Sequence, residues 1–231
     1  MSNPNKTTIY DNITLCLTIG KRPIELEKTL ISLLSRVPFT HIIAINDFRD
    51  EETNEIFRKY CPNGKLINLP KQVGHHLAID HMYQEVKTEF IFHCEDDWLF
   101  TSNIDIQKLI EVLNTSSNAT MICFRKLSDF SFTERELNKI NHFQHCDLSL
   151  VHLKNLHKQW YGYTFNPHLT TINTWKQTNG FKNFKKERHI SRWFRKQSKY
   201  VLFLENGLCQ HIGFESISNP KKTPWFMRFF N

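Results

Sequence analysis

Residues 89–98 read Glu-Phe-Ile-Phe-His-Cys-Glu-Asp-Asp-Trp. The run 90–94 is short, mostly apolar and rich in aromatic and β-branched residues, which is typical of a strand buried on both faces. Three consecutive carboxylates, Glu95, Asp96 and Asp97, follow this run directly. The sequence therefore predicts a buried strand with three acidic residues at its carboxyl end, which is the edge where open α/β sheets bind ligands.

Three adjacent carboxylates repel one another, and each raises the pKa of the others unless a cation lies among them. Hard divalent cations such as Mg²⁺ and Mn²⁺ prefer oxygen ligands and often share them with substrate phosphates. We therefore expect a Mn²⁺ or Mg²⁺ site at this acidic triplet. The alternative is a solvated acidic turn after a strand, which needs no metal.

Strand and helix patterns alternate before the triplet. We expect strands at residues 13–18, 41–45, 65–69 and 90–94, and helices at 24–34, 50–60 and 74–86. This alternation predicts an α/β fold with a parallel, doubly wound N-terminal sheet.

The regular alternation of strands and helices ends after the triplet, and we expect a mixed C-terminal part there. Helices are expected at residues 104–113, 174–179 and 185–197, and strands at 120–124 and 200–204, with one or two more within 163–173. Thr133 and Glu136 have the spacing of a capping box that opens a short helix. Residues 143–162 show no clear pattern.

The length of 231 residues fits one large domain, and the chain shows no internal repeat or low-complexity linker. No stretch approaches the roughly 18 apolar residues of a transmembrane helix. Residues 1–11 are polar and lack the apolar core of a signal peptide. We therefore expect a single domain over residues 1–231 and a cytoplasmic location.

Composition narrows the partners. The formal charge of +7, from 30 basic and 23 acidic residues, suits an anionic partner such as a nucleotide, acidic glycan, nucleic acid or anionic lipid. The six cysteines include no CxxC pair, which argues against a zinc site or disulfide framework. With only seven glycines and neither GxGxxG nor a Walker-type loop, a glycine-rich phosphate cradle is not expected.

Six motifs along the chain belong together. They are Thr18-Ile-Gly-Lys-Arg22-Pro23 with Leu26, Thr29, Leu30 and Leu33; Asn46-Asp47; Gly74-His-His-Leu-Ala78; Glu95-Asp96-Asp97-Trp98; Glu187-Arg-His; and Gln210-His211-Ile212-Gly213. Over about residues 13–213 they resemble the motifs of family 2-type glycosyltransferases with the GT-A fold, and some are similar to those of short bacterial members that build surface glycans. The acidic motif resembles the family's DxD metal motif, although its first acid is glutamate.

The resemblance implies roles for particular residues. Glu95, Asp97 and His211 are the expected metal ligands, and His211 has the alternative of a hydrogen-bonded core histidine. The expected donor-binding residues are Thr18, Arg22, Asp47, Lys71, Gly74, His75 and Asp96.

The donor-side residues have simpler alternatives. Asp47 would accept hydrogen bonds from uracil or ribose, or would cap the following helix. Arg22 and Lys71 would contact the diphosphate, or would be solvated loop charges. His75 at a helix N-terminus would face phosphate, or would lie on the surface.

Glu187 is the expected catalytic base, matching the acceptor-side acid of the family. At helical spacing it shares a face with Ile190, Ser191 and Phe194, which would direct it inward. The alternative is a first-turn glutamate that stabilises the helix dipole.

The resemblance implies a metal-dependent glycosyltransferase that moves a sugar from a nucleotide sugar, with UDP-hexose as the expected donor, to a glycan or lipid-linked acceptor with inversion. Residues 13–100 would bind the donor and residues 101–213 the acceptor. A sugar nucleotidyltransferase is one rival, although it should have a glycine-rich loop where this chain has only Gly20. A non-enzymatic protein that binds a polyanion is another, but three adjacent acids would repel it, and we expect no nucleic-acid partner.

The tail, residues 214–231, is basic and aromatic. Lys221, Lys222 and Arg228 are interleaved with Trp225, Phe226, Phe229 and Phe230. This mixture suits peripheral contact of residues 219–231 with an anionic membrane at its inner face. The alternative is a segment that folds back onto the domain.

Overall fold

A computed structural model describes residues 10–156 and 161–213. The expected membrane contact through residues 219–231 lies outside this part of the chain. Within the described residues, every helix is too short or too polar to span a bilayer.

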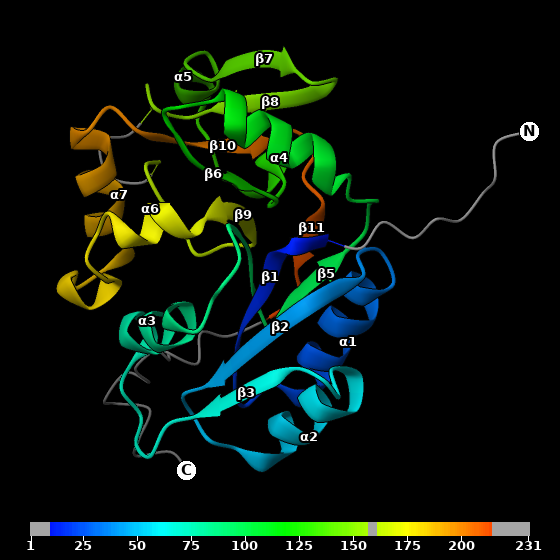
Figure 1. Ribbon diagram of the computed structural model, residues 1–231. Helices are drawn as coiled ribbons and strands as arrows, with labels where there is room; N and C mark the ends of the chain where they lie inside the picture. Colours follow the sequence, from blue (N-terminus) through cyan, green and yellow to red (C-terminus); the bar gives the residue numbers. More distant parts are fainter. Residues whose placement is uncertain (1–9, 157–160, 214–231) are drawn as a thin grey trace, which may run out of the picture.

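The first half alternates strands and helices as expected (Figure 1). Its elements are β1 (Tyr10–Ile19), α1 (Pro23–Leu34), β2 (Phe39–Asn46), α2 (Glu51–Tyr60), β3 (Lys65–Asn68), α3 (His75–Gln84) and β4 (Phe90–Glu95). The acidic triplet thus begins at the last residue of β4, and the expected buried strand is confirmed.

The second half has more and shorter elements. They are β5 (Trp98–Phe100), α4 (Ile106–Thr115), β6 (Ala119–Cys123), η1 (Leu127–Asp129), α5 (Glu134–Leu137), β7 (Asn141–His145), β8 (Leu148–His152), β9 (His168–Thr171), α6 (Ile172–Lys176), η2 (Phe181–Asn183), α7 (Glu187–Lys196), β10 (Tyr200–Leu204) and β11 (Cys209–His211). The Thr133–Glu136 capping box is confirmed at the start of α5. The expectation for residues 163–173 was too long, because only β9 forms there and α6 follows it directly.

Nine strands form one sheet in the order β3-β2-β1-β4-β9-β6-β10-β8-β7. The first four strands are parallel, as the alternation predicts. Strand β9 lies antiparallel between β4 and β6 and so joins the two halves of the chain in one sheet. A separate two-stranded sheet pairs β11 with β5.

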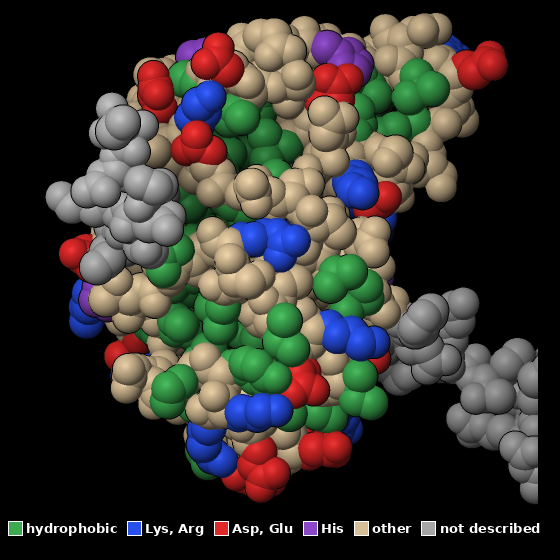
Figure 2. Space-filling model, turned by 90° about the vertical axis from the view of Figure 1, so that its right-hand side faces the viewer, with side chains coloured by type: hydrophobic (Ala, Val, Ile, Leu, Met, Phe, Trp, Pro, Cys, Tyr) green, Lys and Arg blue, Asp and Glu red, His purple; other side chains and the backbone are tan. Residues whose placement is uncertain are grey.

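Helices cover both faces of the large sheet (Figure 1). Leu15 and Phe92 pack with α1, α2 and α4 on one face, whereas Cys16 and Ile91 pack with α3 and α7 on the other. The face formed by α1, α2 and α4 carries interspersed acidic and basic side chains (Figure 2). The alternation of neighbouring residues between two apolar layers explains why β1 and β4 read as continuous apolar runs.

The buried carboxylate of Asp80 joins the first half of the chain to the second half through hydrogen bonds. Asp80 of α3 accepts hydrogen bonds from Trp175 Nε1 at 2.7 Å, from the Phe181 backbone N–H at 2.7 Å and from the Lys182 backbone N–H at 2.8 Å. Gly180, with φ of 95°, precedes this turn, and a Cβ there would lie 2.9 Å from Asp80 Oδ2. Asp80 therefore fixes the segment that leads into α7.

We expect Asp80→Asn to destabilise the protein, because one carboxylate oxygen becomes an NH₂ group that faces backbone N–H donors. Loss of one buried acceptor costs about 1–3 kcal/mol, which lowers the melting temperature of a chain of this size by roughly 3–10 °C. The control is Asp11→Asn at an exposed position of β1. Equal melting temperatures for the two variants in calorimetry would contradict the anchoring role.

Candidate functional site

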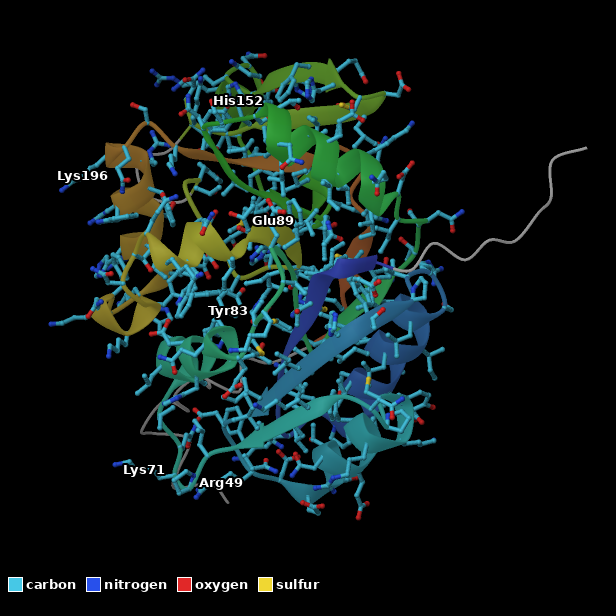
Figure 3. All side chains as sticks on the ribbon, in the orientation of Figure 1. Arg49, Lys71, Tyr83, Glu89, His152 and Lys196 are labelled. Carbon is cyan, nitrogen blue, oxygen red and sulfur yellow. The ribbon has the colours of Figure 1, made fainter. Side chains whose placement is uncertain are left out.

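A cavity of about 360 Å³ opens at the carboxyl ends of β1, β2 and β4, the edge at which a ligand was expected. The expected site residues that line it are Thr18, Arg22, Asp47, Gly74, His75, Glu95, Asp96, Asp97 and His211. Lys71 does not line it; its exposed side chain points outward at the edge of the molecule (Figure 3). Glu187 lies in a second cavity, described below.

Asp96 holds the end of β1 against the end of β4. Its Oδ2 accepts a hydrogen bond from the Gly20 backbone N–H at 2.8 Å, and its backbone carbonyl accepts one from Thr29 Oγ1 at 2.9 Å. The same Thr29 hydroxyl accepts the Trp98 backbone N–H at 3.0 Å. These bonds, which the sequence did not predict, place the acidic triplet between β1 and α1.

Two side chains, Arg22 and His211, contact the Asp97 carboxylate. Arg22 at the start of α1 forms an ion pair with Asp97 and lies 3.5 Å from Asp96 Oδ1, with only 16% of its side chain exposed. The alternative of a solvated loop charge for Arg22 is therefore wrong. Asp97 Oδ2 also lies 3.0 Å from His211 Nε2, whereas the buried Asp97 Oδ1 has no hydrogen-bond partner among the residues that the structure describes.

Strand pairing brings His211 to this point. In the β11–β5 pair, His211 lies opposite Trp98, and the Ile212 backbone N–H donates to the Asp97 carbonyl at 2.8 Å. The His211 side chain is 44% exposed, so the alternative of a core histidine is wrong. The expected proximity of His211 to the acidic residues is found, and its role as a ligand stays a prediction.

Burial sets the electrostatics of the triplet. Loss of solvent, followed by repulsion from Asp97, raises the pKa of Glu95 to about 8 and the pKa of Asp96 to about 7. A hydrogen bond from Trp98 Nε1 to Glu95 Oε2 at 3.2 Å opposes this rise. The carboxyl groups therefore occupy an environment in which added positive charge would be strongly favourable.

The residues fit a divalent cation in part. In residues 10–156 and 161–213, no three His, Cys, Asp or Glu side chains gather closely enough to hold a metal ion by themselves. However, Asp97 Oδ1 is a buried acceptor without a partner in the described part of the chain, and His211 is beside the same carboxylate. Two protein ligands at an open cavity suit a hard cation that takes its remaining ligands from water and a phosphate.

Asp47 holds the loop before α3. Its two carboxylate oxygens accept the backbone N–H groups of Val73 and Gly74, each at 2.8 Å. The alternative that Asp47 caps α2 is wrong, because Asp50 is the N-cap residue and accepts the Thr53 backbone N–H at 3.3 Å. Asp47 remains at the cavity wall.

The start of α3 also faces this cavity. Gly74 is the N-cap residue with φ of 90°, a conformation that favours glycine. His75 is half-buried, with its ring edge-on to Phe165 at 4.8 Å between centroids. Burial, and then His76, lower the pKa of His75 to about 4, so its imidazole is neutral at physiological pH.

A second cavity, of about 870 Å³, adjoins the first and shares Gly74, His75 and Glu95 with it. Glu187, the first residue of α7, lies in this second cavity. Burial raises the pKa of the Glu187 carboxyl, and hydrogen bonds from Thr164 and the Phe165 backbone oppose the rise. Asp96 and Asp97 therefore line the first cavity and Glu187 lines the second, while Glu95 and His75 belong to the wall that both cavities share.

Several wall residues were not predicted. Phe48 and Gln72 line the first cavity, and Lys182, Lys185 and Lys186 line the second. Phe48 could have been found from its place directly after Asn46-Asp47 at a strand end. The lysines read from sequence only as the start of a basic helix.

Comparison with known proteins agrees with this architecture. The family model for glycosyl transferase family 2 matches residues 21–199. No curated protein matches the sequence.

Similar solved structures include the mannosyltransferase PcManGT from Pyrobaculum calidifontis in complex with GDP-Man and Mn²⁺, with a TM-score of 0.61 at 9% identity over 82% of this chain and 53% of that chain. TarS 1–349 from S. aureus in complex with UDP has a TM-score of 0.57 at 12% identity over 86% and 59%. GalNAc-T7 with UDP, GalNAc and Mn²⁺ has a TM-score of 0.61 at 10% identity over 87% and 44%. These likenesses show the GT-A fold, and the chain spans about half the length of these structures.

Gly213 provides a test of the site geometry, because a Cβ there would lie 2.3 Å from Asp97 Oδ2. We expect Gly213→Ala to displace the carboxylate and to cost about 1–3 kcal/mol through overpacking. In an Asp97→Ala background the contact is gone, so the same change should cost much less. Chemical denaturation of the four proteins in this cycle measures the difference. Equal costs in both backgrounds would contradict the close contact between Gly213 and Asp97.

Proposed function

The chain belongs to glycosyl transferase family 2, and from that premise we propose that it moves a sugar from a nucleotide sugar to a hydroxyl group of a glycan or lipid-linked acceptor. One observation carries this proposal: two cavities meet at Gly74, His75 and Glu95. A donor in the first cavity would present its sugar at this junction, and an acceptor in the second would meet it there. Residues 13–100 would then form the donor half and residues 101–213 the acceptor half of a single domain.

The expected donor is a UDP-hexose. Structures similar in fold contain UDP or GDP-Man. In this chain Asp47, Phe48 and Thr18 line the part of the first cavity formed by β1 and β2, where a nucleoside would find a carboxylate, an aromatic ring and a hydroxyl group. These groups suit a planar base and a ribose.

The diphosphate would lie toward the acidic triplet. A bound Mn²⁺ or Mg²⁺ would neutralise the charge that develops on the leaving diphosphate. Asp97 and His211 would hold such an ion, with Glu95 as a further ligand. Arg22, together with the first backbone N–H groups of α3 after Gly74, would bind the phosphate oxygens and fix their orientation.

Glu187 would accept the proton of the acceptor hydroxyl. Transfer with inversion needs a base on the side of the sugar opposite the leaving group. Glu187 lines only the second cavity and Asp97 only the first, which supports this arrangement. Its raised pKa makes it a stronger base than an ordinary glutamate. Both rival interpretations, a sugar nucleotidyltransferase and a polyanion-binding protein, are less well supported, because the family match covers residues 21–199.

A panel of nucleotide sugars tests the proposal directly. With Mn²⁺ present, the full chain should hydrolyse one donor slowly and faster when a suitable glycan is added, with release of the nucleoside diphosphate. If no donor on the panel is bound, hydrolysed or transferred, the proposed activity is wrong.

We expect Asp97→Asn to abolish Mn²⁺-dependent binding of UDP, because the amide removes a negative oxygen from the metal site. Isothermal calorimetry with UDP, with and without Mn²⁺, measures this loss. Asp11→Asn, at an exposed position, is the matched control and should bind as the unmodified protein does. Unchanged Mn²⁺-dependent affinity in Asp97→Asn would show that the metal lies elsewhere.

We expect Glu187→Gln to lower the rate of transfer by roughly 10²–10⁴-fold, the usual contribution of a general base. Affinity for UDP should stay the same, because Glu187 acts on the acceptor. The carboxylate form is lost as pH falls through the raised pKa of Glu187, so transfer by the unmodified protein should decline at a pH above the ordinary glutamate value, and this decline should vanish in the variant.

Glu51→Gln is the matched control, because Glu51 is also the first residue of a helix but is exposed. If Glu187 acted only on the helix dipole, both variants would lose a few tenths to 1 kcal/mol of stability and keep their turnover. That pattern would contradict the role of Glu187 as the base.

A further inference from the structure

The second cavity carries a cluster of positive charge that the proposed reaction does not explain. Lys182, Lys185 and Lys186 line it together with Glu187, and all three lysines are exposed. We call these three residues the lysine cluster. Neither proton removal from an acceptor nor binding of a donor in the first cavity requires cations at this position.

The lysine cluster belongs to a segment that the structure holds in place. Asp80 accepts the Phe181 and Lys182 backbone N–H groups at 2.7 and 2.8 Å. Two residues further on, His76 Nδ1 bonds the Phe184 carbonyl at 2.7 Å. The backbone that presents the cluster is therefore anchored to α3 within η2 and directly after it, which limits the entropy lost when a ligand binds.

Basic side chains predominate in this segment, because residues 182–192 carry five Lys and Arg side chains and one acidic side chain, Glu187. The pKa of His189 in the first turn of α7 is lowered, by desolvation first and then by Arg188, Arg192, Lys186 and Lys185. On the face formed by α1, α2 and α4, by contrast, both signs of charge are interspersed (Figure 2). Repulsion among like charges is unfavourable for the protein alone and is relieved when an anion binds.

We propose that the lysine cluster binds a phosphate group of the acceptor, so that the substrate of the second cavity is a phosphorylated glycan or a glycan on a diphosphate-linked lipid. This inference rests on the proposed function, and it adds the chemical class of the acceptor. Lysine ammonium groups bind phosphate as point charges on flexible stems, which tolerates either kind of phosphate. Because Glu187 shares the cavity, a phosphate bound by the cluster would bring a nearby hydroxyl of the same molecule to the base.

The acceptor phosphate takes no part in bond making. The bond that breaks joins the donor sugar to its diphosphate, and the bond that forms joins that sugar to the acceptor oxygen, whose proton passes to Glu187. The lysine cluster acts on binding and orientation, so its removal should change the selectivity for charged over neutral acceptors.

The test measures the affinity of the full chain for pairs of probes, one with phosphate and one without. The lipid pair is phenoxyundecyl diphosphate-N-acetylglucosamine and its neutral phenoxyundecyl glycoside, and the sugar pair is N-acetylglucosamine 6-phosphate and N-acetylglucosamine. Calorimetry in the presence of UDP and Mn²⁺ gives each affinity without requiring turnover. The test variant is Lys182→Gln/Lys185→Gln/Lys186→Gln.

The matched control is Lys28→Gln/Lys139→Gln/Lys176→Gln, which removes the same charge from exposed positions outside both cavities. We expect the preference for a charged over a neutral probe to fall roughly 10- to 100-fold in the test variant and to persist in the control. The preference should also weaken as salt rises from about 0.05 to 0.5 M. Melting temperatures of both variants check that they are folded.

The outcomes separate the sources of the phosphate. If only the diphosphate lipid binds in a lysine-dependent way, the phosphate belongs to a lipid carrier. If the sugar phosphate also binds in this way, a phosphate on the glycan is sufficient for recognition. Equal affinity for charged and neutral probes, or a preference that the test variant retains, would overturn the inference. If the charged probes bind through the cluster but no nucleotide sugar is hydrolysed, the proposed function fails while the phosphate site stands.

Discussion

Buried negative charge at the carboxyl end of β4 is the constraint on which the site depends. Asp96 and Asp97 are both removed from water, which is costly unless each carboxylate is paired or hydrogen-bonded. The partners come from distant parts of the chain: the Gly20 N–H after β1, the Arg22 guanidinium before α1 and the His211 imidazole from β11. Because these groups compensate the buried charge, the turn after β1 and the strand β11, the last strand of the described chain, lie together at the end of β4.

The parts of this arrangement that have a local signal could be predicted from sequence. Runs that are apolar on both faces predicted β1 and β4, and the alternation of strands with helices predicted the parallel order. The resemblance implied that residues such as Thr18, Asp47 and Glu95 lie at one donor site, and they line one cavity because the carboxyl ends of parallel strands share one edge. Lys71 differs because it lies in an exposed loop, where no neighbouring strand fixes its side chain.

The parts that depend on long-range pairing could not be predicted in this way. Strands β5 and β11 have three residues each, too few for a periodic pattern, and each exists because the other is beside it. The hydrogen bonds of Asp80 likewise join residues far apart in sequence, so nothing near Asp80 marks it as an anchor. For Arg22 the sequence left open a diphosphate contact or a solvated loop charge, because its carboxylate partners follow another strand.

The lysines in the wall of the second cavity have a physical rationale if Glu187 is the base. A base must be ionised to accept a proton, yet burial raises the pKa of Glu187 and so favours its neutral form. A phosphate brought into the same cavity would raise that pKa further by repulsion. Arg125 already lowers it, and cations at Lys182, Lys185 and Lys186 would offset the charge of an incoming phosphate. If the acceptor is an anion, lysines in the cavity wall are therefore needed to keep the Glu187 carboxyl ionised. A neutral acceptor would not require them.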